Sequence, residues 1–180
     1  MSGHGKGAAF EREVSRRLSL WVTKGERDDL FWRTAMSGGR ATLQARKGIV
    51  NRAQAGDIGA IDPAGEALLK HVTIECKFHK DLVILGSLLT GSGKLSSQWA
   101  KHCRESWQSK REPFLIAKEN RCPTLLITTE RAQQLLAIEA LPTLVVYGWA
   151  RGSARLSLIK LFLFDDVVPT LKAWKAKGEK

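Results

Sequence analysis

Apolar residues recur every three or four positions near the start of the chain, and this spacing predicts a first helix over residues 8–23. Its apolar stripe consists of Phe10, Val14, Leu18 and Trp21. This is the periodicity of an amphipathic helix with one buried face. Gly25 follows and favours the left-handed conformation often found just after a helix, so we expect the helix to end there.

The remaining pattern predicts strands mixed with helices. Short apolar segments bounded by turn residues predict strands over residues 30–34, 57–61, 68–77, 113–118, 124–129, 144–149 and 156–164. Longer amphipathic segments predict helices over residues 96–110, 130–138 and 166–177. Asp62-Pro63-Ala64-Gly65 is typical of a turn, so the two strands around it are expected to form a hairpin. This order favours the α/β (or α+β) class, with a central mixed β-sheet flanked by helices.

Length and composition favour a single folded domain and argue against a membrane, secreted or zinc-binding protein. With 180 residues, 43% of them hydrophobic, the chain has enough apolar side chains for one folded domain, which we expect over residues 1–180. No apolar run approaches the roughly 18 residues of a membrane span, and the first residues lack the apolar region of a signal peptide. A cytoplasmic protein is therefore expected. Cys76, Cys103 and Cys122 form no closely spaced pair, which favours reduced thiols over a zinc site.

The chain is strongly basic, with a net charge of +11, and this excess favours an anionic partner such as nucleic acid. No acidic residue occurs between Asp29 and Asp57. The basic residues in that stretch are Arg33, Arg40, Arg46, Lys47 and Arg52. We expect them to face DNA phosphates, although a solvated loop is the plainer alternative. Lys101 and Arg104 on the predicted helix 96–110 form a second candidate DNA contact, with a solubilising helix face as an equal alternative.

The strand predicted over residues 68–77 ends with two opposite charges on one face. Side chains of a strand alternate between its faces, so Glu75 and Lys77 project from the face opposite Cys76. A carboxylate suits a hard cation such as Mg²⁺, and a lysine beside it can orient water or stabilise charge on a phosphate. The alternative is a surface ion pair, which contributes little to stability.

Two further carboxylates strengthen the metal interpretation. Asp57 opens the preceding predicted strand, so it can lie beside Glu75, and two converging carboxylates repel each other unless a cation neutralises them. On the first helix, a rotation of about 100° per residue places Glu11 nearer the apolar stripe than Glu13. Glu11 is therefore expected beside the sheet and Glu13 in solvent.

These residues belong to an ordered set of short motifs. The set comprises Lys6-Gly7-Ala8-Ala9-Phe10-Glu11-Arg12-Glu13, Met36-Ser37-Gly38, Gly56-Asp57-Ile58, Glu75-Cys76-Lys77 and a later strand, residues 113–118, that ends in Lys118. With these motifs the chain resembles the PD-(D/E)xK nuclease superfamily, and within it the archaeal-type Holliday-junction resolvases and their phage relatives. The likeness covers the core, about residues 5–130. The part of the chain beyond Thr129 adds nothing to this likeness, and the role of the strands and helix predicted over residues 140–180 stays open.

The resemblance implies a restriction-endonuclease-like core and a metal-dependent DNA endonuclease. The metal would be Mg²⁺, with Mn²⁺ as a substitute, held by Asp57, Glu75, the Cys76 carbonyl and Glu11, the last of these through a water. Lys77 would be the catalytic lysine, and Ser37 would lie near the phosphate being cut. The partner would be DNA, branched or junction DNA in particular, cut by a homodimer in recombination or repair.

Departures from the family leave the target open. The stretch between Ser37 and Asp57 is longer than in compact resolvases, and so is the connection over residues 62–70. A nuclease of the same chemistry with another DNA target (restriction-like, nicking or repair) is the first alternative. A catalytically inactive basic nucleic-acid-binding module is the second. Trp32, next to the basic stretch, is the one tryptophan considered for nucleic-acid contact. Gln98 matches a functional glutamine of some superfamily branches, or is a surface residue.

Overall fold

The computed structural model describes residues 3–34, 56–80, 86–87, 90–135, 144–149 and 156–163. Several residues singled out above lie outside the described residues. They are Ser37, Arg40, Arg46, Lys47, Arg52 and the predicted helix over 166–177. Their predicted roles stay predictions.

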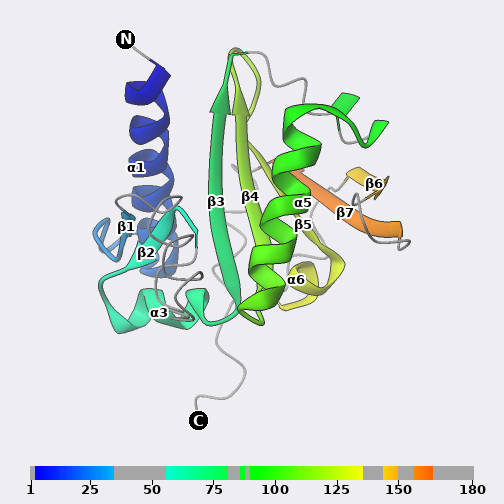
Figure 1. The fold of residues 1–180 in the computed structure, drawn as a ribbon. Helices are drawn as coiled ribbons and strands as arrows, with labels where there is room; N and C mark the ends of the chain where they lie inside the picture. Colours follow the sequence, from blue (N-terminus) through cyan, green and yellow to red (C-terminus); the bar gives the residue numbers. More distant parts are fainter. Residues whose placement is uncertain are drawn as a thin grey trace, which may run out of the picture.

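Helices and strands alternate along the described chain much as the apolar pattern predicts (Figure 1). The helices are α1 (Gly3–Val22), α3 (Pro63–Leu69), α5 (Gly93–Gln108) and α6 (Glu130–Leu135). The strands are β1 (Phe31–Arg33), β2 (Ile58–Ala60), β3 (Val72–His79), β4 (Glu112–Glu119), β5 (Leu125–Thr129), β6 (Leu144–Trp149) and β7 (Leu156–Leu163). None of the described helices is both long and apolar enough to cross a membrane.

A five-stranded sheet with the order β3-β4-β5-β7-β6 forms the centre of the described fold. β3 and β4 are parallel, and the remaining neighbours are antiparallel, so the predicted mixed sheet is present. β1 and β2 form a separate antiparallel ribbon. This ribbon lies beside β3, because Gly56 forms a parallel bridge with Ile74 and the Asp57 N–H donates to the Ile74 carbonyl at 2.8 Å.

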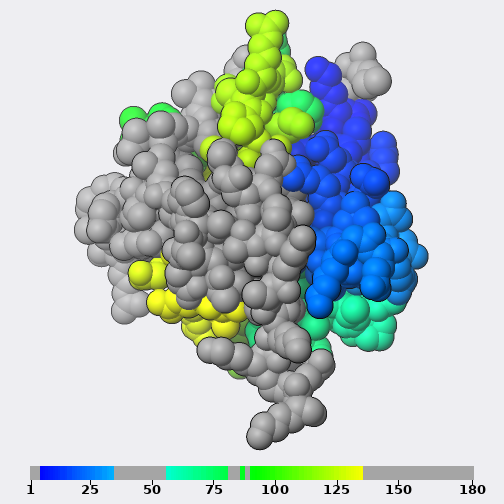
Figure 2. All heavy atoms as spheres, turned by 180° about the vertical axis from the view of Figure 1, so that it is seen from behind, coloured from blue at the N-terminus to red at the C-terminus, as the bar shows by residue number. Residues whose placement is uncertain are grey.

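Helices cover both faces of β3 and β4 (Figure 1). On one face, Ile74, Phe114 and Ile116 pack with the apolar stripe of α1, all of which is buried as predicted. On the other face, Leu115, Ala117 and Ile127 pack with α5. Each strand therefore sends alternate side chains into two different cores. Seen from behind, α1 and the segment that enters β1 form one continuous surface, with α3 beside it (Figure 2).

The predicted hairpin between residues 57–61 and 68–77 is wrong. Asp62 caps a short helix instead: its carboxylate accepts the Ala64 N–H at 3.0 Å, and Pro63 occupies the first turn of α3. The physical reason lies in the strand direction. The Gly56–Asp57 segment runs parallel to β3, and parallel neighbours need a crossover connection rather than a tight turn.

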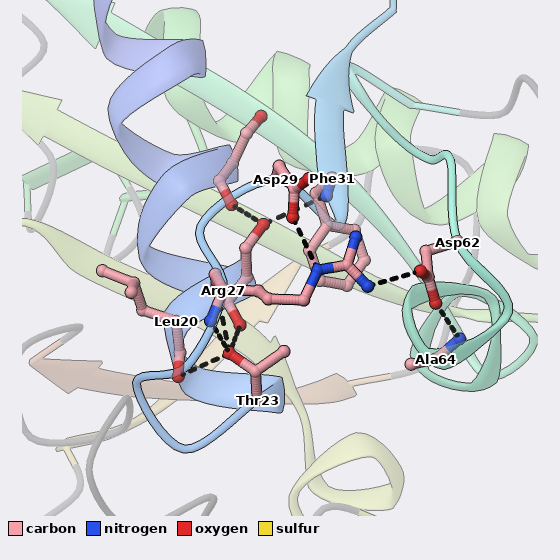
Figure 3. A network of polar contacts seen from close by, with 9 residues as sticks. Leu20, Thr23, Arg27, Asp29, Phe31, Asp62 and Ala64 are labelled. Atoms are coloured by element: carbon pink, nitrogen blue, oxygen red, sulfur yellow. Dashed lines mark hydrogen bonds and ion pairs between the residues drawn. The ribbon is translucent and has the colours of Figure 1, made fainter.

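Arg27, in the loop that follows α1, links this loop to the start of α3 (Figure 3). Its Nε donates to Asp29 Oδ1 at 2.9 Å and its Nη1 donates to Asp62 Oδ2 at 2.7 Å, while the other oxygen of Asp62 holds the Ala64 N–H. Hydrogen bonds to these two carboxylates raise the pKa of the Arg27 guanidinium further above its usual value. The loop before β1 and the start of α3 are thereby held together.

Polar contacts fix α5 against β3. His102 is buried, and its Nε2 donates to the Thr73 carbonyl at 3.1 Å. Thr73 and Ser106 also share a short hydrogen bond through their hydroxyl groups. Burial lowers the pKa of His102 to about 4, so its imidazole is neutral in the folded protein at pH 7. These contacts fix the position of α5 over the face of β3 that carries Glu75 and Lys77.

Candidate active site

A close backbone approach brings Asp57 to the edge of β3 that faces away from β4. Gly56 has φ of +96°, and a Cβ atom there would lie only 2.5 Å from the Ile74 carbonyl oxygen. Only glycine therefore permits this contact. Thr34 supports the same segment, since its hydroxyl donates to the Gly56 carbonyl at 2.7 Å and its N–H donates to the Asp57 carbonyl at 2.8 Å.

The carboxylate of Asp57 is buried against the backbone of β3. The Cys76 N–H donates to Asp57 Oδ2 at 2.9 Å. In a strand, the N–H and C=O of one residue point to the same edge, so the Cys76 carbonyl emerges beside the Asp57 carboxylate. The Cys76 thiol points the other way, into the core with α1, and burial raises its pKa well above the usual value. Only the backbone of Cys76 is therefore available as a ligand.

Glu75 and Lys77 lie on the same face of β3, as the alternation predicts. Lys77 Nζ forms a short ion pair with Glu75 Oε1 and lies 3.6 Å from Asp57 Oδ2. One ammonium group thus contacts both carboxylates. The side chains of all three residues are largely buried, so these charges interact with little screening by solvent.

Burial and the neighbouring charges shift the pKa values of Glu75 and Lys77. Burial raises the pKa of Glu75, and the neighbouring Asp57 charge raises it further, whereas Lys77 counteracts both. Burial alone would lower the pKa of Lys77, but the charges of Glu75 and Asp57 outweigh it, so the pKa of the ammonium is raised. The lysine is therefore held in its charged form between two carboxylates that would otherwise repel each other.

The donor atoms of this cluster fit a hard divalent cation. Asp57 and Glu75 supply carboxylate oxygens that converge on one point, and the Cys76 carbonyl lies at the same edge. Mg²⁺ is commonly held by one or two carboxylates, with water and substrate phosphates completing its shell. Within the described ranges, no group of three His, Cys, Asp or Glu side chains that could hold a metal ion is found.

Glu11 lies on α1, on the side of the predicted apolar stripe, and its side chain contacts β1. Its side chain is 19% exposed against 48% for Glu13, which confirms the predicted difference between the two. The Glu11 carboxylate accepts a hydrogen bond from Arg33 Nε at 2.7 Å. Arg33, predicted as a phosphate contact, thus joins β1 to α1 and retains partial exposure. The predicted roles of both residues, in metal binding and in DNA binding, stay predictions.

The other predicted residues are placed as follows. Lys101 and Arg104 are exposed on α5, and Lys101 lies 3.6 Å from Glu105. Gln98, also on α5, lies 3.5 Å from His79 between their side-chain nitrogens, and its Oε1 is buried without a hydrogen-bond partner. Gln98 therefore faces β3 beyond Lys77 rather than solvent.

Sequence reasoning missed the role of Thr34 and left the position of Lys118 open. Thr34 holds the Gly56–Asp57 segment, yet no local pattern indicates it, because its partners are distant along the chain. Lys118, in the strand motif of the resemblance, lies on the α1 side of the sheet, over the rings of Phe10 and Phe78 at 5.8 Å. It is on the opposite face from Lys77.

Comparison with known proteins identifies the family. Over residues 2–148 of its 180, the chain matches the model of a family described as phage putative PDDEXK endonuclease. No curated protein and no solved structure matches the chain. The family implies a restriction-endonuclease-like fold, a DNA substrate and hydrolysis of phosphodiester bonds. The chain belongs to this phage PDDEXK endonuclease family.

Proposed function

We propose that this chain is an Mg²⁺-dependent DNA endonuclease whose catalytic centre consists of Asp57, Glu75 and Lys77. The observation that carries the proposal is the contact of one ammonium group, Lys77 Nζ, with both carboxylates at the edge of β3 that faces away from β4. Burial of this group beneath α5 strengthens the interactions among its charges. A surface ion pair would need no such arrangement of three largely buried charges.

Asp57, Glu75 and the Cys76 carbonyl would hold the cation. When bound, a divalent cation lowers the pKa of a water ligand and stabilises negative charge on the phosphate. The protein fixes its donors in advance: the Cys76 N–H orients the Asp57 carboxylate, and the rigid strand sets the position of Glu75. Glu11 would act through a water, and Ser37 would contact the phosphate.

Lys77 has a separate task from the two carboxylates. Its charged ammonium can stabilise the phosphate in flight or hold the attacking water in line. In the reaction, a water oxygen forms a bond to phosphorus while the bond to the 3′ oxygen breaks. The water gives up a proton and the 3′ oxygen takes one, leaving 5′-phosphate and 3′-hydroxyl ends.

The preferred target is proposed to be branched DNA, such as a four-way junction, cut by a homodimer. Two symmetric nicks across a junction need two sites, which a twofold dimer supplies. The net charge of +11 supports DNA as the partner, and Lys101, Arg104 and the basic stretch around Arg46 would contact phosphates. The family match names an endonuclease and leaves the DNA structure open.

A panel of labelled substrates tests the proposal. A four-way junction, a flap, a nicked duplex and a linear duplex of matched sequence are each incubated with the protein, in Mg²⁺ and in EDTA. We expect Mg²⁺-dependent products, with paired nicks near the junction. Cleavage of linear duplex alone would reject the branched target but keep the chemistry. Salt-sensitive binding without any product would reject the enzyme and favour an inactive binding module.

A further inference from the structure

Arg33 and Glu11 join the β1–β2 ribbon to α1 through an ion pair whose two partners differ in exposure. Arg33 Nε donates to Glu11 Oε2 at 2.7 Å. The Glu11 side chain is 19% exposed, whereas the Arg33 side chain is 40% exposed. A carboxylate that is largely withdrawn from water needs a partner, and Arg33 supplies it. The same contact leaves part of the arginine side chain open to solvent.

Glu11 holds the Arg33 guanidinium at one side only. Among the described residues, no hydrogen bond or ion pair engages Nη1 or Nη2 of Arg33. A guanidinium is planar and carries N–H donors on all of its nitrogens. Its two terminal nitrogens form a fork that matches the oxygens of a phosphate group. The contact through Nε therefore restrains the guanidinium and leaves its phosphate-binding end available.

The backbone of Arg33 lies next to the segment that carries Asp57. Arg33 pairs with Ile58 in the ribbon, and the N–H of the following residue, Thr34, donates to the Asp57 carbonyl at 2.8 Å. Arg33 is also the first basic residue of the stretch that lacks acidic residues between Asp29 and Asp57. A surface with this charge attracts the phosphates of DNA.

We propose that Glu11 is a positioning residue that holds the Arg33 guanidinium so that its two terminal nitrogens bind a DNA phosphate. The inference rests on the proposed nuclease function, because that function makes DNA the substrate. An unrestrained arginine side chain loses rotamer freedom when it binds, and an arginine already held by Glu11 loses less. This task is separate from the water-mediated contact of Glu11 with the cation, since it needs no metal.

The sign of the effect of a charge substitution distinguishes positioning from long-range electrostatics. Removing a carboxylate makes a DNA-binding surface more positive, which tightens DNA binding. Positioning predicts the opposite for Glu11, because Arg33 then loses its restraint. Glu13 on the same helix is the matched control. Its side chain is 48% exposed, and its carboxylate lies 3.9 Å from Arg17 Nη1 and from Lys118 Nζ.

DNA binding is measured in EDTA by fluorescence anisotropy, with a labelled four-way junction and a linear duplex of matched sequence. We expect Glu11→Gln to weaken binding about threefold and Glu11→Ala about fivefold, because the charged acceptor for Arg33 Nε is lost. Arg33→Ala should weaken binding about tenfold and lower the slope of log affinity against log salt by about one. Both probes should respond alike, since the contact is to a phosphate. Glu13→Gln should leave the affinity unchanged or slightly tighter.

A double variant separates positioning from an independent contact. In the Arg33→Ala background, Glu11→Gln should no longer weaken binding, since the side chain that it positions is gone. Unchanged or tighter binding by Glu11→Gln alone overturns the inference, and tighter binding shows that Glu11 restrains Arg33 from DNA. Weakening by Glu11→Gln that persists without Arg33 also overturns it. Failure of the nuclease proposal is seen separately, as the absence of an Mg²⁺-dependent product from the wild-type protein.

Discussion

The backbone N–H of Cys76 donates a hydrogen bond to the carboxylate of Asp57 at 2.9 Å. This bond joins two segments that are distant along the chain, at the edge of β3 that faces away from β4. It orients an acidic side chain toward the face that carries Glu75 and Lys77, beneath α5. The candidate site therefore depends on the backbone geometry at this edge as much as on its side chains.

The close approach at Gly56 should be essential for both folding and cleavage. Gly56→Ala places a Cβ atom 2.5 Å from the Ile74 carbonyl and imposes a positive φ on alanine. We expect the free energy of unfolding to fall by about 2–4 kcal/mol and cleavage to be lost. Urea denaturation and an Mg²⁺-dependent cleavage assay measure the two effects.

Gly25 provides a matched control for this prediction. Its φ is +95°, nearly that of Gly56, yet a Cβ atom there meets nothing within 4 Å. Gly25→Ala should cost only about 1–2 kcal/mol of stability and leave cleavage unchanged. Wild-type cleavage by Gly56→Ala would show that the position of Asp57 does not matter.

Two lysines on neighbouring strands should differ sharply in function. Lys77 contacts both carboxylates, whereas Lys118 faces α1 and lies 5.8 Å from the centre of the Phe10 ring. Lys77→Met should lower the cleavage rate by about a hundredfold or more, because the charge beside the phosphate is lost. Lys118→Met should leave the rate within about twofold, since it lies on the other face of the sheet. Similar rates for the two variants in single-turnover assays would contradict the assignment.

The stability of the fold should depend on pH through His102. Burial lowers its pKa to about 4 in the folded protein, below the value of about 6.5 in an unfolded chain. Protonation therefore favours unfolding. The contribution of His102 is complete above pH 6.5 and is lost as the pH falls toward 4, by up to about 3 kcal/mol.

Denaturation curves between pH 4 and pH 7 measure this dependence. His102→Gln should flatten the slope of unfolding free energy against pH, whatever its stability at pH 7. An unchanged slope in His102→Gln would show that the buried imidazole is not the titrating group.

Most elements could be predicted from the sequence because their patterns are local. The stripe on α1 and the apolar strands β3 to β7 follow from periodicity alone. Which strands pair with each other does not follow from periodicity, since paired strands are distant along the chain. Asp62-Pro63 is equally suited to a turn and to the start of a helix, and only the burial of Leu68 and Leu69 in the structure decides for α3.

The candidate site also combines residues that a local pattern predicts with residues that only distant contacts bring into place. Alternation along one strand places Glu75 and Lys77 together, whereas Asp57 reaches them through the parallel bridge between Gly56 and Ile74 and not through the predicted hairpin. The support that Thr34 and Gly56 give to Asp57 has no local pattern, because it arises from contacts between the ribbon and β3. The inward orientation of His102 follows from the helical register of α5, in which Leu95, Trp99 and Ser106 are also buried.

Cleavage of a supercoiled plasmid by Glu75→Ala tests whether Glu75 belongs to the catalytic centre. The wild type and this variant are compared in Mg²⁺ and in EDTA, with Glu66→Ala on the exposed side of α3 as the control, and DNA affinity is measured in parallel. We expect Glu75→Ala to reduce cleavage to the level seen in EDTA while DNA affinity stays within about threefold, because the carboxylate acts on the cation and Lys77 and not on DNA. Undiminished Mg²⁺-dependent cleavage by a folded Glu75→Ala protein would show that Glu75 is not part of the catalytic centre.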